Sequence, residues 1–230
     1  MLICRIMTAA MFFLLLLGTP LGAKENQLQD NIYNPGQLKP IDSQLKVQAG
    51  DPAPDFTLPA VSGRSIQLSQ YQGQKNVVLS FVPAAWTPVC SGQWPGYNLV
   101  QDLFNVNDTV MLGITTDNIP TLHAWTREMG GLWFEVLSDF WPHGVVAEEY
   151  GVFRQDGRSE RALFIVDKEG VIQYVDIHDI DDQPDNEELF KVLRKLEPDA
   201  VIPARREEAK PAPAAPKGEP KSVILYCRPG

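Results

Sequence analysis

The sequence has few of the residues from which most catalytic and metal centres are built. It contains three histidines and three cysteines in 230 residues. The histidines, His123, His143 and His178, are dispersed and lack the close spacing typical of metal ligands. The chain also has no glycine-rich phosphate loop and no serine nucleophile motif. These absences argue against a metal centre, a nucleotide site and serine-based hydrolysis, and we expect no bound cofactor.

Positive charge is also scarce. The chain has 20 lysines and arginines against 29 aspartates and glutamates, a formal net charge of -9. Binding to a nucleic-acid polyanion needs clustered basic side chains, so nucleic acid is not an expected partner. A hydrophobic content of 44% is sufficient for a packed core, and the length allows one domain with extensions.

The longest apolar run lies near the N-terminus, and it is short. Residues 9–18 follow Arg5 and precede a small-residue stretch that ends at Ala23. This pattern predicts a signal peptide over residues 1–23, because the run is too short to span a bilayer comfortably. The protein is therefore expected to be exported, periplasmic or secreted. The alternative is an uncleaved membrane anchor, since Leu21 is not the small residue preferred three positions before the cleavage site.

Cleavage there would leave two cysteines, Cys90 and Cys227. In an oxidising compartment such a pair often forms a structural disulfide, which is the simplest alternative for these two. Cys90, however, lies where an apolar strand, residues 77–82, runs into the start of a helix. A helix N-terminus directs free N–H groups and a positive dipole toward the sulfur and favours its thiolate form. The sequence therefore predicts a reactive thiol at Cys90.

The residues before Cys90 form a motif. Pro83, Thr87 and Cys90 have the spacing Pro-x-x-x-Thr-x-x-Cys, which resembles the peroxidatic motif of the peroxiredoxins. The resemblance extends over residues 47–196. It includes the entry segment 50–59, Ser-Asp-Phe-Trp-Pro-His-Gly at 138–144 and Glu-Tyr-Gly-Val at 149–152. Within the family, the Phe-Trp-Pro-His-Gly run is most similar to the subgroup of bacterioferritin comigratory protein and alkyl hydroperoxide reductase E.

The resemblance implies roles for the residues around the thiol. Arg161 matches the family's arginine, which would hold both the thiolate and a peroxide oxygen. The Thr87 hydroxyl and the backbone N–H of Cys90 would be the other donors, and Pro83 would shield the sulfur from water. The alternative for Arg161 is a surface arginine beside Glu160.

Two neighbouring positions depart from the family pattern. Gln93 stands where many members have glutamate, which removes a charge but keeps a hydrogen-bonding side chain near Arg161. Trp86 stands where phenylalanine is frequent, and packing is its expected role. Both are predicted to support the site rather than to react.

Hydrophobic patterning predicts an α/β protein with a central mixed sheet flanked by helices, which the resemblance identifies as a thioredoxin-like fold. A hairpin is expected around Gly63, a tight turn over 167–170 and a helix cap at Asp185. The predicted strands are 55–61, 65–68, 76–82, 109–115, 135–137, 162–166 and 171–176, and the predicted helices are 93–104, 120–128, 145–150 and 187–196.

The regions outside the domain have a different composition. Residues 24–46 form a polar extension ahead of the domain at 47–197, and residues 198–221 are a Pro/Ala/Lys-rich linker. The tail 222–230 is apolar and is similar to the first strand of a glutaredoxin-like domain. Two hypotheses account for it: truncation before a second redox domain, for example at a selenocysteine codon, or a short strand that carries the resolving cysteine Cys227.

The predicted function is a thiol-dependent peroxidase that reduces hydrogen peroxide or organic hydroperoxides through a sulfenic acid at Cys90. The expected partners are the peroxide and an external thioredoxin- or glutaredoxin-like thiol reductant, with Cys227 as a candidate resolving cysteine and a homodimer as a candidate assembly. One alternative is an exported thiol-disulfide oxidoreductase, although Thr87 stands where the first cysteine of a Cys-x-x-Cys motif would be. The other is a non-catalytic redox-sensing or binding module.

Overall fold

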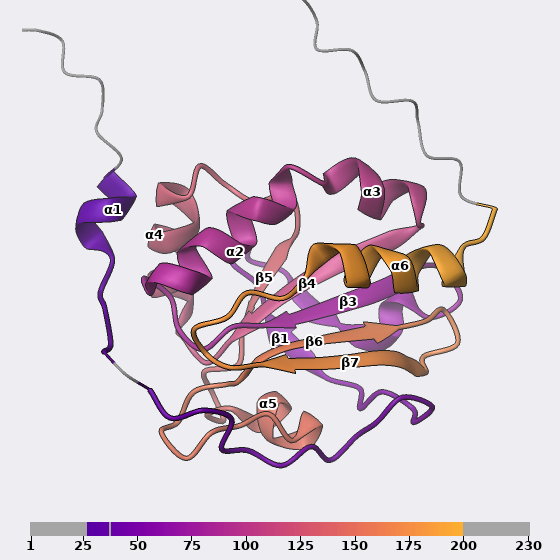
Figure 1. Ribbon diagram of the computed structural model, residues 1–230, viewed down its shortest axis with the longest axis horizontal. Helices are drawn as coiled ribbons and strands as arrows, with labels where there is room; N and C mark the ends of the chain where they lie inside the picture. The colour runs from indigo at the N-terminus through magenta and orange to yellow at the C-terminus, as the bar shows by residue number, and fades with distance from the viewer. Residues whose placement is uncertain (1–26, 37, 200–230) are drawn as a thin grey trace, which may run out of the picture.

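A computed structural model describes residues 27–36 and 38–199 of the chain (Figure 1). The predicted signal peptide, Cys227 and most of the predicted linker lie outside these residues. Within the described ranges, no helix is both long enough and apolar enough to cross a bilayer.

The centre of the fold is a five-stranded mixed sheet with the strand order β5-β4-β3-β6-β7. Strands β3, β4 and β5 are parallel, whereas β6 is antiparallel to β3 and β7 is antiparallel to β6. A separate antiparallel hairpin joins β1 to β2. The strands are β1 (Thr57–Pro59), β2 (Ser65–Gln67), β3 (Asn76–Phe81), β4 (Thr109–Thr115), β5 (Glu135–Ser138), β6 (Arg161–Val166) and β7 (Ile172–His178). All seven lie close to their predicted bounds.

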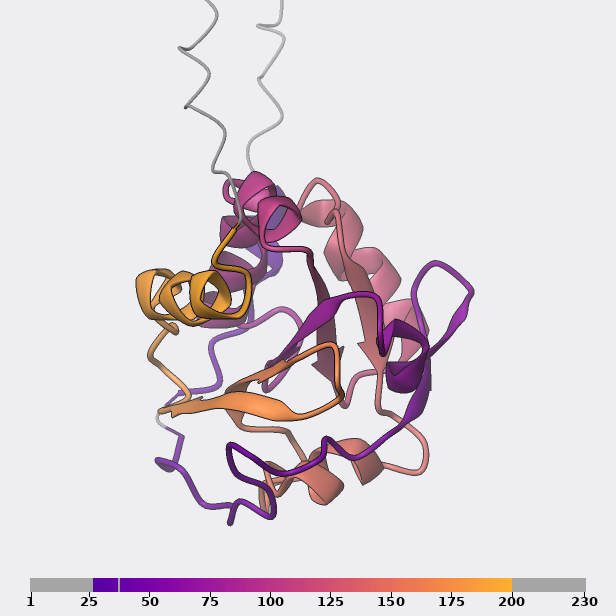
Figure 2. The same ribbon diagram turned by 90° about the vertical axis from the view of Figure 1, so that its right-hand side faces the viewer.

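Helices cover both faces of this sheet. Helices α2, α3, α4 and α6 lie on one face and α5 lies on the other (Figures 1 and 2). The helices are α1 (Gln27–Asn31), the 3₁₀ turn η1 (Leu68–Tyr71), α2 (Pro88–Asn98), α3 (Gln101–Val106), α4 (Ile119–Glu128), α5 (Val145–Tyr150) and α6 (Asn186–Leu196). The predicted thioredoxin-like α/β fold with a central mixed sheet is confirmed.

The two faces of the sheet hold two separate hydrophobic clusters. Along β3, Val77, Leu79 and Phe81 pack on the α5 side, whereas Val78 packs on the α2 side. Every residue of β3 is nevertheless buried, which explains why its sequence is mainly apolar on both faces rather than alternating.

The predicted turns and cap are present. Gly63 and Gly170 have positive φ angles of 83° each, in the left-handed region that glycine adopts without a steric penalty. The Asp185 side chain accepts a hydrogen bond from the backbone N–H of Glu187 and caps α6.

The prediction of one helix over 93–104 is wrong. The structure has two helices, α2 and α3, which are separated at Leu99 and Val100. The N–H groups of Leu99 and Val100 bond to carbonyls three residues back, so the last turn of α2 tightens and the helix ends. Two glycines and a proline inside α2, at Gly92, Gly96 and Pro95, lower the helix propensity of this stretch.

Asp139 begins the connection to α5 and is completely buried. Its two carboxylate oxygens accept hydrogen bonds from the backbone N–H groups of Val146 and Ala147, at 3.2 and 2.9 Å. Burial disfavours the charged carboxylate more than these bonds favour it, and the pKa of Asp139 is raised from 3.8 to about 6.

This shift makes the stability of the fold pH-dependent. The folded protein holds the Asp139 proton more tightly than the unfolded chain does. Protonated Asp139 therefore stabilises the fold fully below pH 3.8, and this stabilisation is lost as the pH rises through about 6. Relative to Asp139→Asn, the free energy of unfolding of the wild type should fall by on the order of 2–3 kcal/mol over that window. Denaturant unfolding of both proteins at several pH values measures this difference, and parallel pH profiles would contradict it.

Candidate active site

Helix α2 places Cys90 in its first turn. Pro88 occupies the first helical position, where its missing N–H costs nothing, and Thr87 precedes it in an extended conformation as the N-cap. The backbone N–H of Ser91 bonds to the Thr87 carbonyl at 2.9 Å and closes this turn. Cys90 is fully buried and is the only cysteine among the described residues.

Arg161 reaches Cys90 because β6 runs antiparallel to β3. The pairing of Phe81 with Ala162 brings the first residue of β6 to the edge of the sheet where β3 ends and the chain turns toward α2. Leu163 and Ile165 pack on the α2 side, and Arg161 shares their face by the two-residue period of the strand. Its Nη2 donates to the Cys90 Sγ at 3.4 Å.

Arg161 is buried and is not a surface arginine beside Glu160. Its side chain is 1% exposed. Glu160 instead pairs with the buried Arg154, with 2.6 Å between Arg154 Nη1 and Glu160 Oε2. The alternative in which Arg161 is a surface residue is therefore wrong.

Three neutral contacts fix the Arg161 side chain. Its Nε and Nη2 donate to the Ile180 carbonyl at 3.1 and 2.6 Å, and its Nη1 donates to Gln93 Oε1. In the part of the chain that the structure describes, no carboxylate forms an ion pair with Arg161. Among the groups in contact with this cation, Cys90 is the one that can become an anion.

Gln93 connects Arg161 to a buried polar network in the α2 side of the core. Its Nε2 donates to the Tyr97 hydroxyl at 3.2 Å and lies 3.5 Å from Ser80 Oγ, which also accepts from Trp94 Nε1 at 3.2 Å. Burial raises the pKa of Tyr97, which keeps its phenol neutral. Sequence reasoning missed Ser80 and Tyr97, because a single serine in an apolar strand and a helical tyrosine give no distinctive pattern.

The Thr87 hydroxyl bonds within the loop before α2. Its Oγ1 donates to the Ala84 carbonyl at 3.0 Å, and its lone pairs are able to accept. Its role as a donor to a peroxide stays a prediction, and in this rotamer it can also accept the O–H of a hydroperoxide. The backbone N–H of Cys90 has no acceptor within the described residues, which leaves it available as a donor.

The loop before Cys90 is held in an unusual conformation. Trp86 has a φ of 61°, in the left-handed region that bulky residues rarely adopt. Two hydrogen bonds hold the loop: the Trp86 carbonyl accepts from the N–H of Tyr33 at 2.7 Å, and the N–H of Ala85 donates to Asp117 Oδ2 at 2.7 Å. Trp86 also packs against the α2-side cluster, in agreement with its expected packing role.

A cavity of about 330 Å³ opens above this site. Pro83, Thr87 and Arg161 line it together with residues from the N-terminal segment and from the loop after β7. Cys90 does not line it but contacts Arg161, which does. The structure thus brings Pro83, Thr87, Cys90, Gln93 and Arg161 together, whereas Cys227 lies outside the described residues.

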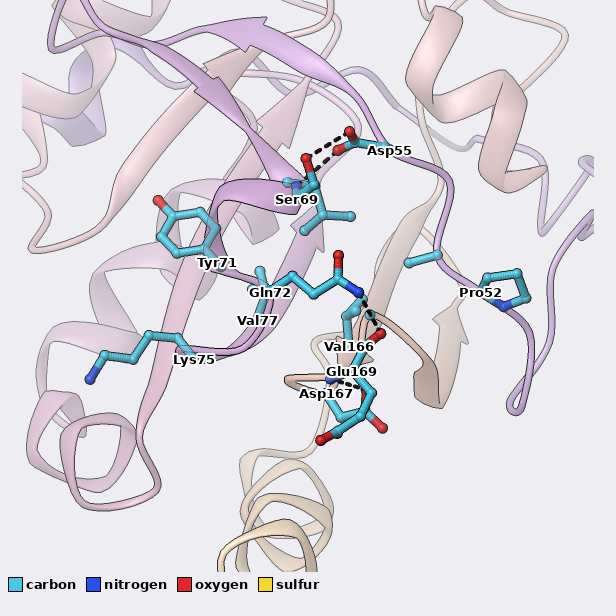
Figure 3. A pocket seen from close by; sticks show the side chains of 13 residues that line it. Pro52, Asp55, Ser69, Tyr71, Gln72, Lys75, Val77, Val166, Asp167 and Glu169 are labelled. Atoms are coloured by element: carbon cyan, nitrogen blue, oxygen red, sulfur yellow. Dashed lines mark hydrogen bonds between the residues drawn. The ribbon is translucent and has the colours of Figure 1, made fainter.

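A second cavity, of about 230 Å³, lies at the opposite end of β3 and β6 (Figure 3). Asp55, one of its charged residues, accepts hydrogen bonds from Gln67 and from both the side chain and the N–H of Ser69. Burial opposes ionisation of Asp55, but its hydrogen bonds outweigh it and lower the pKa of this carboxyl. No cysteine lines this cavity, and its serine, Ser69, is hydrogen-bonded to Asp55 rather than to a general base such as histidine, so the thiol site is the stronger catalytic candidate. In the described ranges, no group of three or more His, Cys, Asp or Glu side chains is arranged to hold a metal ion.

Together, the thioredoxin-like sheet and a buried cysteine at a helix N-terminus beside an arginine define a thiol-based redox enzyme. The model of the AhpC/TSA family matches residues 49–175 of the chain. The chain belongs to this family, the peroxiredoxins, and is a thiol-dependent peroxidase.

Individual relatives agree with this assignment. Alkyl hydroperoxide reductase E of Mycobacterium tuberculosis is 38% identical over 132 residues, covering 57% of this chain and 86% of that protein. The chloroplastic 2-cysteine peroxiredoxin of Chattonella marina is 31% identical over 196 residues, covering 79% and 98%. Among solved structures, AhpC of Mycobacterium tuberculosis superposes with a TM-score of 0.60 at 25% identity, covering 67% of this chain and 96% of that one.

The contact between Arg161 and Cys90 leads to a first kinetic prediction. Arg161→Met keeps a long apolar side chain but removes the cation and its hydrogen bonds, and it should slow oxidation of Cys90 by hydrogen peroxide by about 100-fold or more. Stopped-flow fluorescence of the reduced protein measures the rate. Arg194→Met is the matched control, since Arg194 is exposed on α6 and does not line the cavity, and its rate should stay near that of the wild type. An unchanged rate in Arg161→Met would remove Arg161 from the mechanism.

Gln93 is predicted to act by positioning Arg161. Gln93→Leu removes the acceptor of Arg161 Nη1 and leaves a buried donor unsatisfied, so oxidation of Cys90 should slow by about 10-fold. Gln93→Glu restores an acceptor and should recover part of the rate, which a purely space-filling role would not predict. Equal rates for the leucine and glutamate variants would argue against positioning.

Proposed function

We propose that Cys90 is the peroxidatic residue of this peroxidase and that Arg161 is its main electrostatic partner. The observation that carries the proposal is the 3.4 Å contact between Arg161 Nη2 and Cys90 Sγ, two residues that are almost completely buried. A guanidinium stabilises negative charge more strongly there than at an exposed position, because little water screens the interaction.

The reaction begins with attack of the Cys90 thiolate on one oxygen of the hydroperoxide. A sulfur–oxygen bond forms, the O–O bond breaks, and the sulfur carries away an OH group as a sulfenic acid. The other oxygen leaves as hydroxide or alkoxide and takes up one proton, which gives water or an alcohol. Arg161 and the free N–H of Cys90 can donate to the oxygens as charge moves onto the leaving group, and Thr87 Oγ1 can accept the peroxide O–H.

Return to the thiol requires two further reducing equivalents. A thiol attacks the sulfenic sulfur to form a disulfide and release water, and a second thiol then frees Cys90. We expect an external thioredoxin- or glutaredoxin-like reductant to supply these thiols, with Cys227 as the candidate for the first. A homodimer remains the candidate assembly.

Export is part of the same proposal. The apolar run at 9–18, after Arg5 and before Ala23, supports a signal peptide and a periplasmic or secreted enzyme. The alternative is that the run remains as an anchor. In either case the reductant must act outside the cytoplasm.

One experiment tests the assignment of Cys90. The reduced protein is mixed with one equivalent of hydrogen peroxide, and both the rate of oxidation and the intact mass of the product are measured. Oxidation should be far faster than that of free cysteine, because the site stabilises the charge that develops on the leaving oxygen. Cys90→Ser should abolish it.

The product identifies the role of Cys227. In Cys227→Ser the product should gain about 16 Da, the mass of one oxygen of a sulfenic acid. If the wild type forms a Cys90–Cys227 disulfide in place of the sulfenic acid, Cys227 resolves Cys90. A rate equal to that of free cysteine would contradict the proposal and favour the oxidoreductase or the redox-sensing module.

A further inference from the structure

The N-terminal arm, which we define as residues 33–36 and 38–46, lies outside the region that matches the peroxiredoxin family, residues 49–175. It nevertheless supplies part of the catalytic cavity, through Asn34, Pro35, Gly36 and Leu38. We infer that this arm is a substrate-selecting wall, which favours hydroperoxides with an apolar organic group over hydrogen peroxide. The inference rests on the proposed role of Cys90.

The arm is attached to the catalytic loop itself. The N–H of Tyr33 donates to the Trp86 carbonyl at 2.7 Å, one residue before Thr87. Pro35 and Leu38 are half-buried, although much of the arm is exposed. The expected polar extension is therefore largely solvent-exposed, but its start borders the thiol site, which its composition did not indicate.

A buried ion pair holds the next part of the arm. Arg154 donates to the carbonyls of Lys39 and Pro40, at 2.9 and 3.3 Å. Its partner Glu160 accepts the N–H groups of Asp42 and Ser43 through Oε1, at 2.9 and 3.1 Å. The pair thus binds the arm through its backbone, and both side chains are almost completely buried.

Beyond this pair, the arm passes close to the start of the segment after α5. Gly151 has a φ of 73°, and a Cβ atom at this position would come within 2.3 Å of both the Gln44 carbonyl oxygen and the Lys46 nitrogen. Only glycine permits this approach without a shift of the backbone. The arm is therefore held at several points along its length, which gives the wall a defined position.

The lining of the cavity indicates the chemistry of the substrate. It includes the apolar residues Pro35, Leu38, Pro83, Val89 and Ile180 together with three charged residues, Arg158, Arg161 and Asp181, of which Arg161 contacts the sulfur. A volume of about 330 Å³ falls within the range of small-molecule sites. Hydrogen peroxide has no apolar part to bury, whereas an alkyl or aryl hydroperoxide gains from contact with this wall. The thiolate, the hydroperoxide and one proton then give the sulfenic acid and an alcohol, as described above.

The test compares two peroxides with the same protein. The second-order rate constants for Cys90 oxidation by cumene hydroperoxide and by hydrogen peroxide are measured for the wild type and for Leu38→Ala. Truncation removes an apolar contact that only the organic peroxide can make. The rate constant for cumene hydroperoxide divided by that for hydrogen peroxide should therefore fall by about 10-fold in Leu38→Ala. Ile41→Ala is the matched control, since Ile41 belongs to the same arm, is 44% exposed and does not line the cavity.

The outcomes separate this inference from the function on which it rests. If hydrogen peroxide reacts rapidly with both the wild type and Leu38→Ala and the ratio is the same in the two, the substrate-selecting role of the arm is contradicted, whereas the peroxidase function is not. A parallel fall of both rates would also overturn it, because it would indicate a general disturbance of the site. If neither peroxide reacts faster with the wild type than with free cysteine, the proposed role of Cys90 fails and the inference fails with it.

Discussion

The burial of the Arg161 cation beside the Cys90 sulfur is the constraint on which the site depends. A buried guanidinium has five N–H donors to satisfy and a charge that is costly to remove from water. The Ile180 carbonyl and the Gln93 side chain satisfy donors without neutralising the charge. The geometry of the loop after β7 and of the first turns of α2 is therefore tied to a single side chain.

The strand direction makes this contact possible. Because β6 is antiparallel to β3, its first residue lies at the edge of the sheet where β3 ends. A strand of six residues in the opposite direction would start at the far edge, about 20 Å away. The mixed sheet thus brings an arginine 71 residues further along the chain to the N-terminus of α2. The same alternation directs Glu160 to the other side, where it pairs with Arg154.

Local patterns predicted the parts of the site that depend on local sequence. The apolar strand and the cysteine at a helix start indicated a reactive thiol, and the family resemblance added Arg161. The contacts of Arg161 with Ile180, and of Glu160 with Asp42, join residues that no periodicity relates. The hydrogen bond from the Thr87 hydroxyl to the Ala84 carbonyl was not predicted, because it depends on the geometry of the strained loop before α2. Long-range polar contacts of this kind leave no signature in a single sequence.

Gln93 gives the site a particular electrostatic balance. A carboxylate at this position would share the charge of Arg161, and the sulfur would then be one of two anions around one cation. The amide keeps the hydrogen bond to Nη1 but adds no charge. The buried cation is consequently poorly compensated while Cys90 is a neutral thiol, and it is better compensated once the sulfur or the leaving oxygen is negative. Interactions that strengthen along the reaction in this way lower its barrier, whereas equal stabilisation of all states would not. If Arg161 acts as proposed, its neutral surroundings favour catalysis at some cost to the stability of the resting fold.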